Sequence, residues 1–403
     1  GLGDVYKRQD LHRAYKQRSF LLMESTPSVT NWQGISRPKR PGMHQLSSLQ
    51  AVAHGANGVG YFQWRQSRGG EEKFHGAVVS HAGHENTRTF REVSVVGKLL
   101  AQLEPILESV NQAEVALIYD FQNEWALNLA QLPRSVDKNY QERCLVHYRH
   151  FWQNGVTVDI INSTFAELSN YKLLVAPMLY MLQEGVAERM ADYVEAGGTL
   201  VTTYLTGVVD QSDLVFLGGS PGPLKEMLGI WIEETDVLFD HHQQSIQLTQ
   251  DTLSSTRIQG DTLYPVKKYA DIVHLQGAEA IGIYEQDFYA GSPAVTVNKF
   301  GSGQAYYLAA RYDDVFLADF YGWLGKVLGL KKAVSSPLLS GVNAQIRRTD
   351  AEKYIFLLNF EPLPQTVRLE NPTIVDALTG QVVSGEITLG GHGFRILKLE
   401  NDP

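Results

Sequence analysis

The sequence predicts an α/β fold in three successive parts, on two observations. In residues 10–111 and again in 112–332, short apolar runs alternate with helical stretches, a pattern typical of parallel strands with helices on their faces. Residues 333–403 instead hold short strands separated by turn signals such as Thr-Gly and Gly-Gly, which favours a small antiparallel sandwich or barrel.

The first part is organised around residues 19–32, SFLLMESTPSVTNW. Residues 20–23 form a continuous apolar run, which predicts a strand buried on both faces. The run stops at Glu24, and the following Ser, Thr, Pro and Asn predict a loop. A carboxylate at the carboxyl end of such a strand lies where (β/α) barrels place their chemistry. The pattern alone fits a carboxylate that merely caps the loop equally well.

Residues 44–57 follow with their apolar side chains on one stripe, which predicts a helix. Residues 58–67 predict a second buried strand, and 68–86, rich in glycine, histidine and glutamate, a loop where that strand ends. A long amphipathic helix is expected to start at Asn86 or Thr87. Its core-facing side chains would be Phe90, Val93, Val96, Leu99, Leu103 and Leu107.

The sequence of the second part predicts a layer of parallel strands, followed by a run of further strands. Apolar strands are expected at 114–119, 156–161, 173–177 and 200–204, with helices at 139–154 and 184–195. Strands with the sequences DIVHL, AIGIY, AVTVN and QAYYLAA come next, and a helix over 313–330 closes this part.

The composition and charge of the chain argue against two classes of binding partner, nucleic acids and membranes. A net charge of −9 argues against binding to a nucleic-acid phosphate backbone, which requires a basic face. No apolar run approaches the length of a membrane span, so no membrane partner is expected. The single cysteine excludes an internal disulfide and suits a reducing compartment, so a cytoplasmic protein is expected.

The segment MESTPSVTNW, followed by PGMHQLSSLQAVAHGANGVGYFQWRQSRGGEEKFHGAVVSH, resembles glycoside hydrolase family 42, the retaining β-galactosidases. The resemblance is dense over residues 19–108 and looser towards the C-terminus. It implies that 10–111 are the C-terminal part of a catalytic TIM barrel. It further implies that 112–332 are an amidotransferase-like (flavodoxin-like) domain that mediates homotrimer formation. No cofactor and no metal are expected in these residues.

The resemblance also implies roles for four side chains. Glu24 matches the catalytic nucleophile, and Trp32 the tryptophan that lines the galactose subsite. Glu72 and His75 match the pair that binds sugar hydroxyls, with Glu71 as the alternative if the register is off by one. The structural alternatives are a core tryptophan that holds the loop and a solvated polar loop at EEKFHG. Trp64 and Arg65 are supporting candidates.

Residues 1–9, GLGDVYKRQ, match the in-frame translation of a transposon-based sequencing adapter, so the natural chain is expected to begin near Asp10. Only about two βα units precede the second part, so the N-terminal part of the barrel, with the acid/base glutamate, is expected to be missing. The one Asn-Glu pair, Asn123-Glu124, follows the strand at 114–119 and is interpreted as a coincidence.

Cys144, His147 and His150 recur every third residue on a predicted helix. They lack a recognised metal-binding spacing, and a packed or solvated helix face is the favoured interpretation. Cys144 also lacks the glycine-flanked elbow of a nucleophile.

Two functional hypotheses follow. The first is a fragment of a retaining β-galactosidase that hydrolyses terminal non-reducing β-D-galactose residues through a covalent glycosyl-enzyme on Glu24, inactive when expressed alone. The alternative is a non-catalytic carbohydrate-binding or assembly module.

Overall fold

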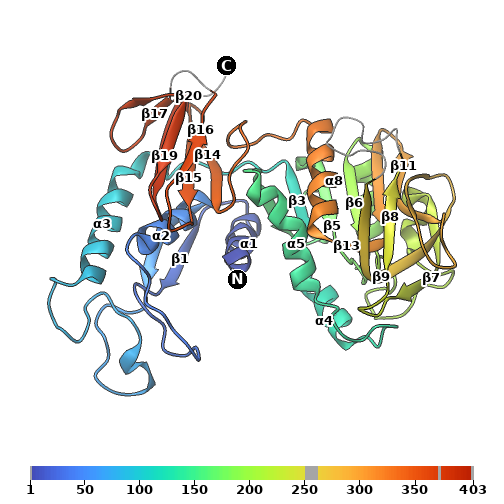
Figure 1. Cartoon of the computed structure of the whole chain (residues 1–403), viewed down its shortest axis with the longest axis horizontal. Helices are drawn as coiled ribbons and strands as arrows, with labels where there is room; N and C mark the ends of the chain where they lie inside the picture. The colour runs from blue at the N-terminus through green and yellow to red at the C-terminus, as the bar shows by residue number, and fades with distance from the viewer. Residues whose placement is uncertain (1, 250–261, 371–373, 401–403) are drawn as a thin grey trace. The chain divides into compact units, whose positions relative to one another are not determined.

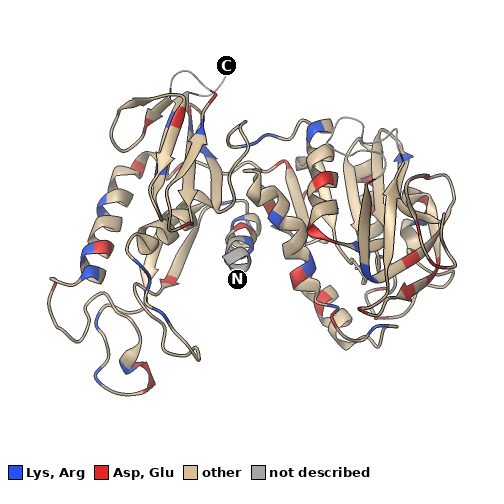
Figure 2. Ribbon diagram, viewed as in Figure 1, with Lys and Arg blue, Asp and Glu red and all other residues tan. Residues whose placement is uncertain are grey.

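The computed structural model describes residues 2–249, 262–370 and 374–400 (Figure 1); Gly1, the first of the nine residues attributed to the adapter, lies outside them. The chain divides into two compact units, which are described separately. Unit 1 comprises residues 1–112, 152–157 and 332–403, and unit 2 comprises 113–151 and 158–331. Acidic and basic residues are interspersed along the elements of both units (Figure 2).

The N-terminal half of unit 1 contains one βαβ step, as predicted. Strand β1 (Phe20–Ser25) leads through helix α2 (Met43–Ala53) to strand β2 (Ala56–Tyr61), and the two strands pair in parallel. Gly60 permits this close pairing, because a Cβ atom there would lie 2.6 Å from the carbonyl oxygen of Met23. The other elements are α1 (Leu2–Ala14), the 3₁₀ turns η1 (Glu71–Phe74) and η2 (Glu104–Ile106), and α3 (Arg88–Gln102).

Helix α3 begins where the sequence predicted, because the Thr87 side chain accepts a hydrogen bond from the backbone N–H of Phe90 at 3.2 Å. The predicted apolar stripe is only partly buried. Val96 and Leu103 lie in the core, whereas Leu107 is 46% exposed. The helix ends at Gln102 and the chain turns through η2, so Leu107 falls outside the helical periodicity on which its burial was predicted.

The prediction that β1 is buried on both faces is wrong. Leu21 is 61% exposed and Met23 is 76% exposed. Within the described residues β1 pairs only with β2, so this two-stranded sheet has no second layer over the face that carries Leu21 and Met23. Strand β2 is likewise only partly buried beyond its first residue.

The C-terminal half of unit 1 is antiparallel, as predicted. One sheet has the order β14 (Val342–Arg348), β15 (Glu352–Asn359), β20 (Phe394–Glu400), β17 (Ile374–Asp376) and β18 (Val382–Val383). A second sheet pairs β16 (Gln365–Arg368) with β19 (Glu386–Leu389). Side chains of α2 and η2 share a core with β15 and β20, including Leu49, Val52, Ile106, Phe356 and Ile396. Residues 10–111 and 333–403 therefore pack as one body.

The Arg347 side chain makes many hydrogen bonds beside that core. It is fully buried, and its guanidinium donates to the backbone carbonyls of Val52 (3.0 Å), Ala56 (3.0 Å) and Ile106 (3.1 Å). It also donates to the carbonyl (3.0 Å) and hydroxyl (2.8 Å) of Ser109 and to the Asn57 side chain. Burial and the nearby Arg13 lower the pKa of Arg347 to about 10, so the group is still charged at neutral pH.

Unit 2 is built on one large mixed sheet, consistent with the predicted amidotransferase-like class. Its parallel layer has the order β12, β6, β5, β3, β4, and antiparallel strands extend it beyond β12. The parallel strands are β3 (Val115–Ile118), β4 (Val158–Ile161), β5 (Leu173–Ala176), β6 (Thr199–Thr203) and β12 (Gly303–Leu308). The antiparallel strands are β7 (Ile230–Val237), β8 (Gln244–Leu248), β9 (Leu263–Leu275), β10 (Glu279–Tyr284), β11 (Pro293–Phe300) and β13 (Ala310–Tyr312).

The helices of unit 2 include three that were predicted and one that was not. Helices α5 (Tyr140–Gln153), α6 (Val186–Glu195) and α8 (Asp314–Val327) match the predicted stretches within a few residues. Helix α4 (Phe121–Leu129) was not predicted, because its apolar residues lie on both its buried and its exposed sides and so give no amphipathic period. None of the helices in the described ranges has the length and apolar character needed to cross a membrane.

His44, in the first turn of α2, is buried, and its imidazole makes no hydrogen bond to the described residues. Neither ring nitrogen has a partner among the described residues, and the ring packs 5.3 Å from that of Tyr61. Burial lowers the pKa of His44 to about 4, and the nearby Lys39 and Arg88 act in the same direction.

We expect His44→Leu to raise the free energy of unfolding of unit 1 at pH 7 by about 1 kcal/mol, because two unsatisfied buried nitrogens are removed. Between pH 6.5 and 4, His44 is protonated in the unfolded chain but remains neutral in the folded protein. The wild type should therefore lose up to about 3 kcal/mol over this range that the variant keeps. Hydrogen–deuterium exchange of α2 peptides across this range measures the difference, and parallel pH profiles for the two proteins would contradict it.

Candidate active site

The segments that carry the four predicted site residues lie against each other in unit 1. Glu24 is at the carboxyl end of β1, and the loop that follows contains Trp32. The backbone N–H of Gly76 donates to the carbonyl of Val29 at 2.6 Å, and the Asn31 side chain donates to the carbonyl of Glu71. Gly76 is required for this approach, since a Cβ atom there would lie 2.7 Å from the Val29 nitrogen. The loop after Glu24 is therefore bonded to the segment that carries Glu72 and His75.

His75 is a buried anchor of this arrangement, only 2% exposed. Its Nδ1 lies 3.0 Å from the carbonyl oxygen of Gly76, which can only accept, so Nδ1 carries the proton in the neutral ring. Its Nε2 then offers a lone pair, and the hydroxyl of Thr26 lies 3.5 Å away as a weak donor. The Phe62 ring and the imidazole meet in a T-shaped contact, with 5.0 Å between their ring centroids. Ring position and tautomer are both determined by these neighbours.

Lys39 is a second anchor, and sequence reasoning missed it. Its Nζ donates to the carbonyl of Thr26 at 2.6 Å, and its backbone N–H donates to the carbonyl of Ser28 at 3.1 Å. Burial lowers the pKa of Lys39 to about 8, against an opposing effect of Glu92. Nothing in the run SRPKRPG distinguishes Lys39 from its basic neighbours, so no sequence signal could have identified it.

The remaining candidates form an open surface. Glu24 and Glu72 are exposed, and Trp32 is 71% exposed, so Trp32 is not a core residue in this structure. Within the described part of the chain, no hydrogen-bond donor reaches the Glu24 carboxylate. The arrangement presents a carboxylate at the end of β1 and an aromatic face on the loop that follows, and this loop is bonded to a neighbouring segment with a second carboxylate. Such a set can bind a sugar ring and its hydroxyls along one wall.

Trp64 and Arg65 lie three and four residues beyond the end of β2. The carbonyl of Trp64 accepts from the backbone of Val79 at 2.7 Å, which closes the loop over residues 68–78. The Trp64 ring contacts Phe90 at the start of α3, with 6.3 Å between ring centroids. Both side chains are exposed, and the segment acts here as the base of the loop that carries Glu72.

Comparison with known families accounts for most of the chain. Residues 2–103 match a family model described as β-galactosidase, 113–331 match the β-galactosidase trimerisation domain, and 341–399 match the β-galactosidase C-terminal domain. The chain belongs to glycoside hydrolase family 42. The predicted resemblance and fold class are thereby confirmed.

Individual family 42 proteins agree over nearly the whole chain. The β-galactosidase Pbg of Clostridium perfringens is 47% identical over 390 residues, which are 96% of this chain and 56% of that protein. BglY of Alicyclobacillus acidocaldarius is 46% identical over 389 residues, again 96% of this chain and 56% of the relative. The chain thus spans about half the length of the curated relatives it matches.

Solved family 42 structures have the same fold. The cold-adapted β-galactosidase of Rahnella sp. R3 superposes with a TM-score of 0.93 at 45% identity, covering 99% of this chain and 57% of that one. Gan42B, a family 42 β-galactosidase from G. stearothermophilus, gives a TM-score of 0.93 at 42% identity, with the same coverage of both chains. Gan42B has also been solved as a catalytic mutant in which a glutamate is replaced by alanine.

Side chains outside this site have structural roles in unit 2. Cys144 is fully buried, and His147 is buried with its Nδ1 2.5 Å from the hydroxyl of Tyr321. Burial lowers the pKa of His147 to about 3, so the ring is neutral at physiological pH. In the ranges that the structure describes, no three His, Cys, Asp or Glu side chains are grouped to hold a metal ion.

Asn123 and Glu124 are both hydrogen-bonded to other residues of unit 2. The Asn123 side chain donates to the carbonyl of Met178 at 3.0 Å and accepts from the backbone N–H of Met181 at 2.9 Å. The Glu124 carboxylate accepts a hydrogen bond from the hydroxyl of Tyr119. Both side chains are occupied in joining α4 to the sheet, in agreement with the interpretation of this Asn-Glu pair as a coincidence.

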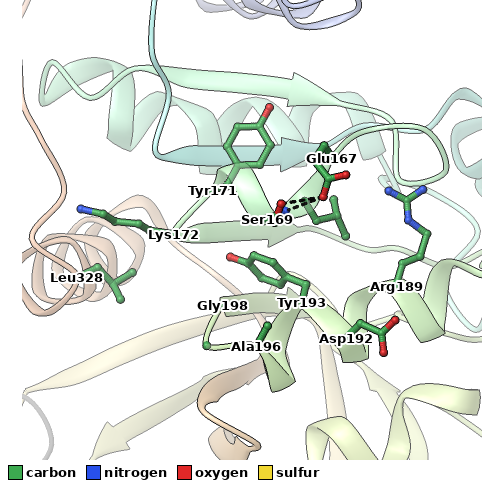
Figure 3. Close-up of a pocket in the computed structure, with 12 residues that line it drawn as sticks. Glu167, Ser169, Tyr171, Lys172, Arg189, Asp192, Tyr193, Ala196, Gly198 and Leu328 are labelled. Carbon is green, nitrogen blue, oxygen red and sulfur yellow. Dashed lines mark hydrogen bonds between the residues drawn. The ribbon is translucent and has the colours of Figure 1, made fainter.

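A hollow of about 650 Å³ lies beside α6 in unit 2, lined by charged and tyrosine side chains (Figure 3). Its polar groups are mostly committed to the protein. Glu167 accepts from Ser169, Arg189 donates to the carbonyls of Thr164 and Ala166, and the Tyr193 hydroxyl donates to the carbonyl of Thr199 at 3.1 Å. This hollow shows no group arranged for chemistry, and the candidate site remains the surface around Glu24.

Proposed function

We propose that the chain is the C-terminal portion of a retaining β-galactosidase that removes terminal non-reducing β-D-galactose residues. The observation that carries the proposal is the bonding of the Glu24 loop to the segment of Glu72 and His75, in a chain of this family. Three kinds of group needed for a galactose subsite thus lie on neighbouring segments: a carboxylate nucleophile, an aromatic wall and hydroxyl-binding groups.

In the proposed reaction the Glu24 carboxylate attacks the anomeric carbon, the glycosidic bond breaks, and a covalent glycosyl-enzyme forms. Water then releases galactose with net retention. A second carboxyl group, about 5–5.5 Å from the first, must protonate the leaving oxygen and later activate the water. We assign this acid/base to the part of the barrel that precedes Asp10, and we attribute residues 1–9 to the adapter.

The sugar would be oriented by three side chains. The exposed Trp32 ring offers a face for the apolar C–H surface of galactose. The Glu72 carboxylate accepts hydrogen bonds from sugar hydroxyls. His75 would accept a hydrogen bond from a sugar hydroxyl at Nε2, where the weak 3.5 Å contact with the Thr26 hydroxyl is the one that the sugar could replace at least cost.

We further propose a homotrimer, supported by the match of residues 113–331 to a β-galactosidase trimerisation domain. The proposed domains are 10–111, 112–332 and 333–403. A cytoplasmic location is supported by the lone, buried Cys144.

The 403-residue chain expressed alone should show no measurable cleavage of nitrophenyl β-D-galactoside, because its acid/base group is absent. The same chain joined to the in-frame sequence upstream of Asp10 should cleave it. Turnover by the isolated chain that is abolished in Glu24→Gln would refute the assignment of a missing acid/base.

The alternative is a non-catalytic carbohydrate-binding or assembly module, and the two hypotheses predict different gene sequences upstream of Asp10. A start codon near Asp10, preceded by a stop codon, would support the module. An upstream barrel half with an Asn-Glu pair would support the enzyme, and native codons for residues 1–9 would refute the adapter.

A further inference from the structure

Lys39 closes the base of the loop that follows Glu24. Its ammonium group donates to the carbonyl of Thr26 at 2.6 Å, and its backbone N–H donates to the carbonyl of Ser28 at 3.1 Å. The two ends of the loop over residues 26–39 therefore meet, as they do in an Ω-loop. A pKa of about 8 leaves Lys39 charged at neutral pH, and a charged donor makes a stronger hydrogen bond than a neutral one.

The pairing of β1 with β2 is irregular at Glu24. Leu22 pairs with Val59. The next paired residue of β1, Ser25, lies opposite Tyr61, so β1 contains one residue more than β2 over this stretch. An extra residue of this kind bends a strand and redirects its side chains. The position of the Glu24 carboxylate therefore depends on how the backbone is held just after it.

Thr26 connects Lys39 to two groups of the candidate site. It is the second residue after Glu24, and its carbonyl accepts the hydrogen bond from Lys39. Its hydroxyl lies 3.5 Å from Nε2 of His75. A shift of the Thr26 backbone would therefore move the carboxylate of Glu24 relative to the imidazole of His75.

The tip of the loop, which carries Trp32, is held by other bonds. The Val29 carbonyl and the Asn31 side chain are hydrogen-bonded to the backbone of residues 71–76. Lys39 takes part in neither bond. Loss of the Lys39 ammonium group should therefore loosen the base of the loop and leave the aromatic face at its tip in place.

We propose that Lys39 is a positioning residue for the nucleophile, which acts through the Thr26 carbonyl on the rate of attack by Glu24 and has little effect on the affinity for the sugar. The inference rests on the β-galactosidase function proposed above. A displacement of the reacting atoms by about 1 Å can slow an enzymatic step by about 100-fold. The groups that bind the sugar at the tip of the loop keep their own supports.

A mechanism-based inactivator measures this step by itself. The probe is a dinitrophenyl β-D-galactoside with fluorine in place of the hydroxyl next to the anomeric carbon. A bond forms between a Glu24 carboxylate oxygen and the anomeric carbon as the bond to dinitrophenolate breaks, and this anion leaves without needing a proton. Fluorine slows the attack of water on the glycosyl-enzyme, so the labelled peptide accumulates and mass spectrometry identifies it. The protein is the chain joined to the in-frame sequence upstream of Asp10.

In Lys39→Met the maximal rate of inactivation should fall by about 30-fold, whereas the concentration of inactivator that gives half this rate should change by less than about threefold. The matched control is Arg37→Met, which removes an exposed basic side chain from the same loop and should leave both values unchanged. Lys39→Arg keeps a charged donor and should give an intermediate rate. Equal losses in Lys39→Met and Arg37→Met would overturn the proposal.

Circular dichroism shows whether Lys39→Met folds. If it does not, Lys39→Gln provides the test, because its side chain stays polar but is too short to reach the Thr26 carbonyl, and the same loss of rate is expected. A wild type that is not labelled at Glu24 would refute the proposed function itself. A wild type labelled at Glu24, with Lys39 variants that are inactivated at the same rate, would refute the positioning role alone.

Discussion

Glu24→Gln in the complete reading frame is expected to lower kcat on nitrophenyl β-D-galactoside by about 10⁴-fold or more. The amide has nearly the shape of the carboxylate but cannot attack the anomeric carbon, so the glycosyl-enzyme does not form. Steady-state kinetics measure the loss. The matched control is Glu85→Gln, an exposed glutamate in the loop before α3, which should keep wild-type activity.

Azide separates a nucleophile from an acid/base. In Glu24→Gly, azide can enter the space left by the side chain and attack the anomeric carbon directly. The carbon–nitrogen bond forms as the bond to nitrophenolate breaks, with one inversion, so the product is the α-galactosyl azide. Recovery of the β-anomer would mean that Glu24 acts as the acid/base, and the assignment of its role would be wrong.

Arg347→Met is expected to lower the free energy of unfolding of unit 1 by about 4 kcal/mol. Methionine fills part of the volume but leaves buried carbonyls of Val52, Ala56 and Ile106 without their donors. Arg347→Lys should recover only part of the loss, because one ammonium cannot reach six acceptors spread around a planar guanidinium. Hydrogen–deuterium exchange of peptides from α2 and β15 reports the stability of this unit specifically.

The matched control for Arg347 is Arg395→Met on β20. Arg395 is half-exposed, and its guanidinium lies 3.7 Å from the Asp376 carboxylate, so its loss should cost under about 1 kcal/mol. Equal exchange rates in the two variants would show that the buried bonds of Arg347 contribute nothing beyond a surface charge.

The candidate site was predictable where short stretches of sequence carry the signal. An apolar run that ends in Glu24 indicates a strand end, and the family resemblance adds Trp32, Glu72 and His75 as candidates. The burial of β1 was predicted wrongly, because an apolar run reports what a strand could bury and not what covers it. The contact between His75 and Thr26 was not predictable, since the two residues are 49 positions apart and their contact depends on how two loops pack.

By itself, the sequence determined the family, the order of the three parts, most helices and strands, and the residues that could carry the chemistry. These follow from periodicity, turn residues and motifs, which act over a few residues. Only the tertiary structure decided that Lys39 supports the Glu24 loop and that Arg347 joins the C-terminal sheet to α2. The physical reason is that hydrogen bonds and packing join residues that are far apart in the chain. A local sequence pattern does not specify which of these distant residues will be in contact.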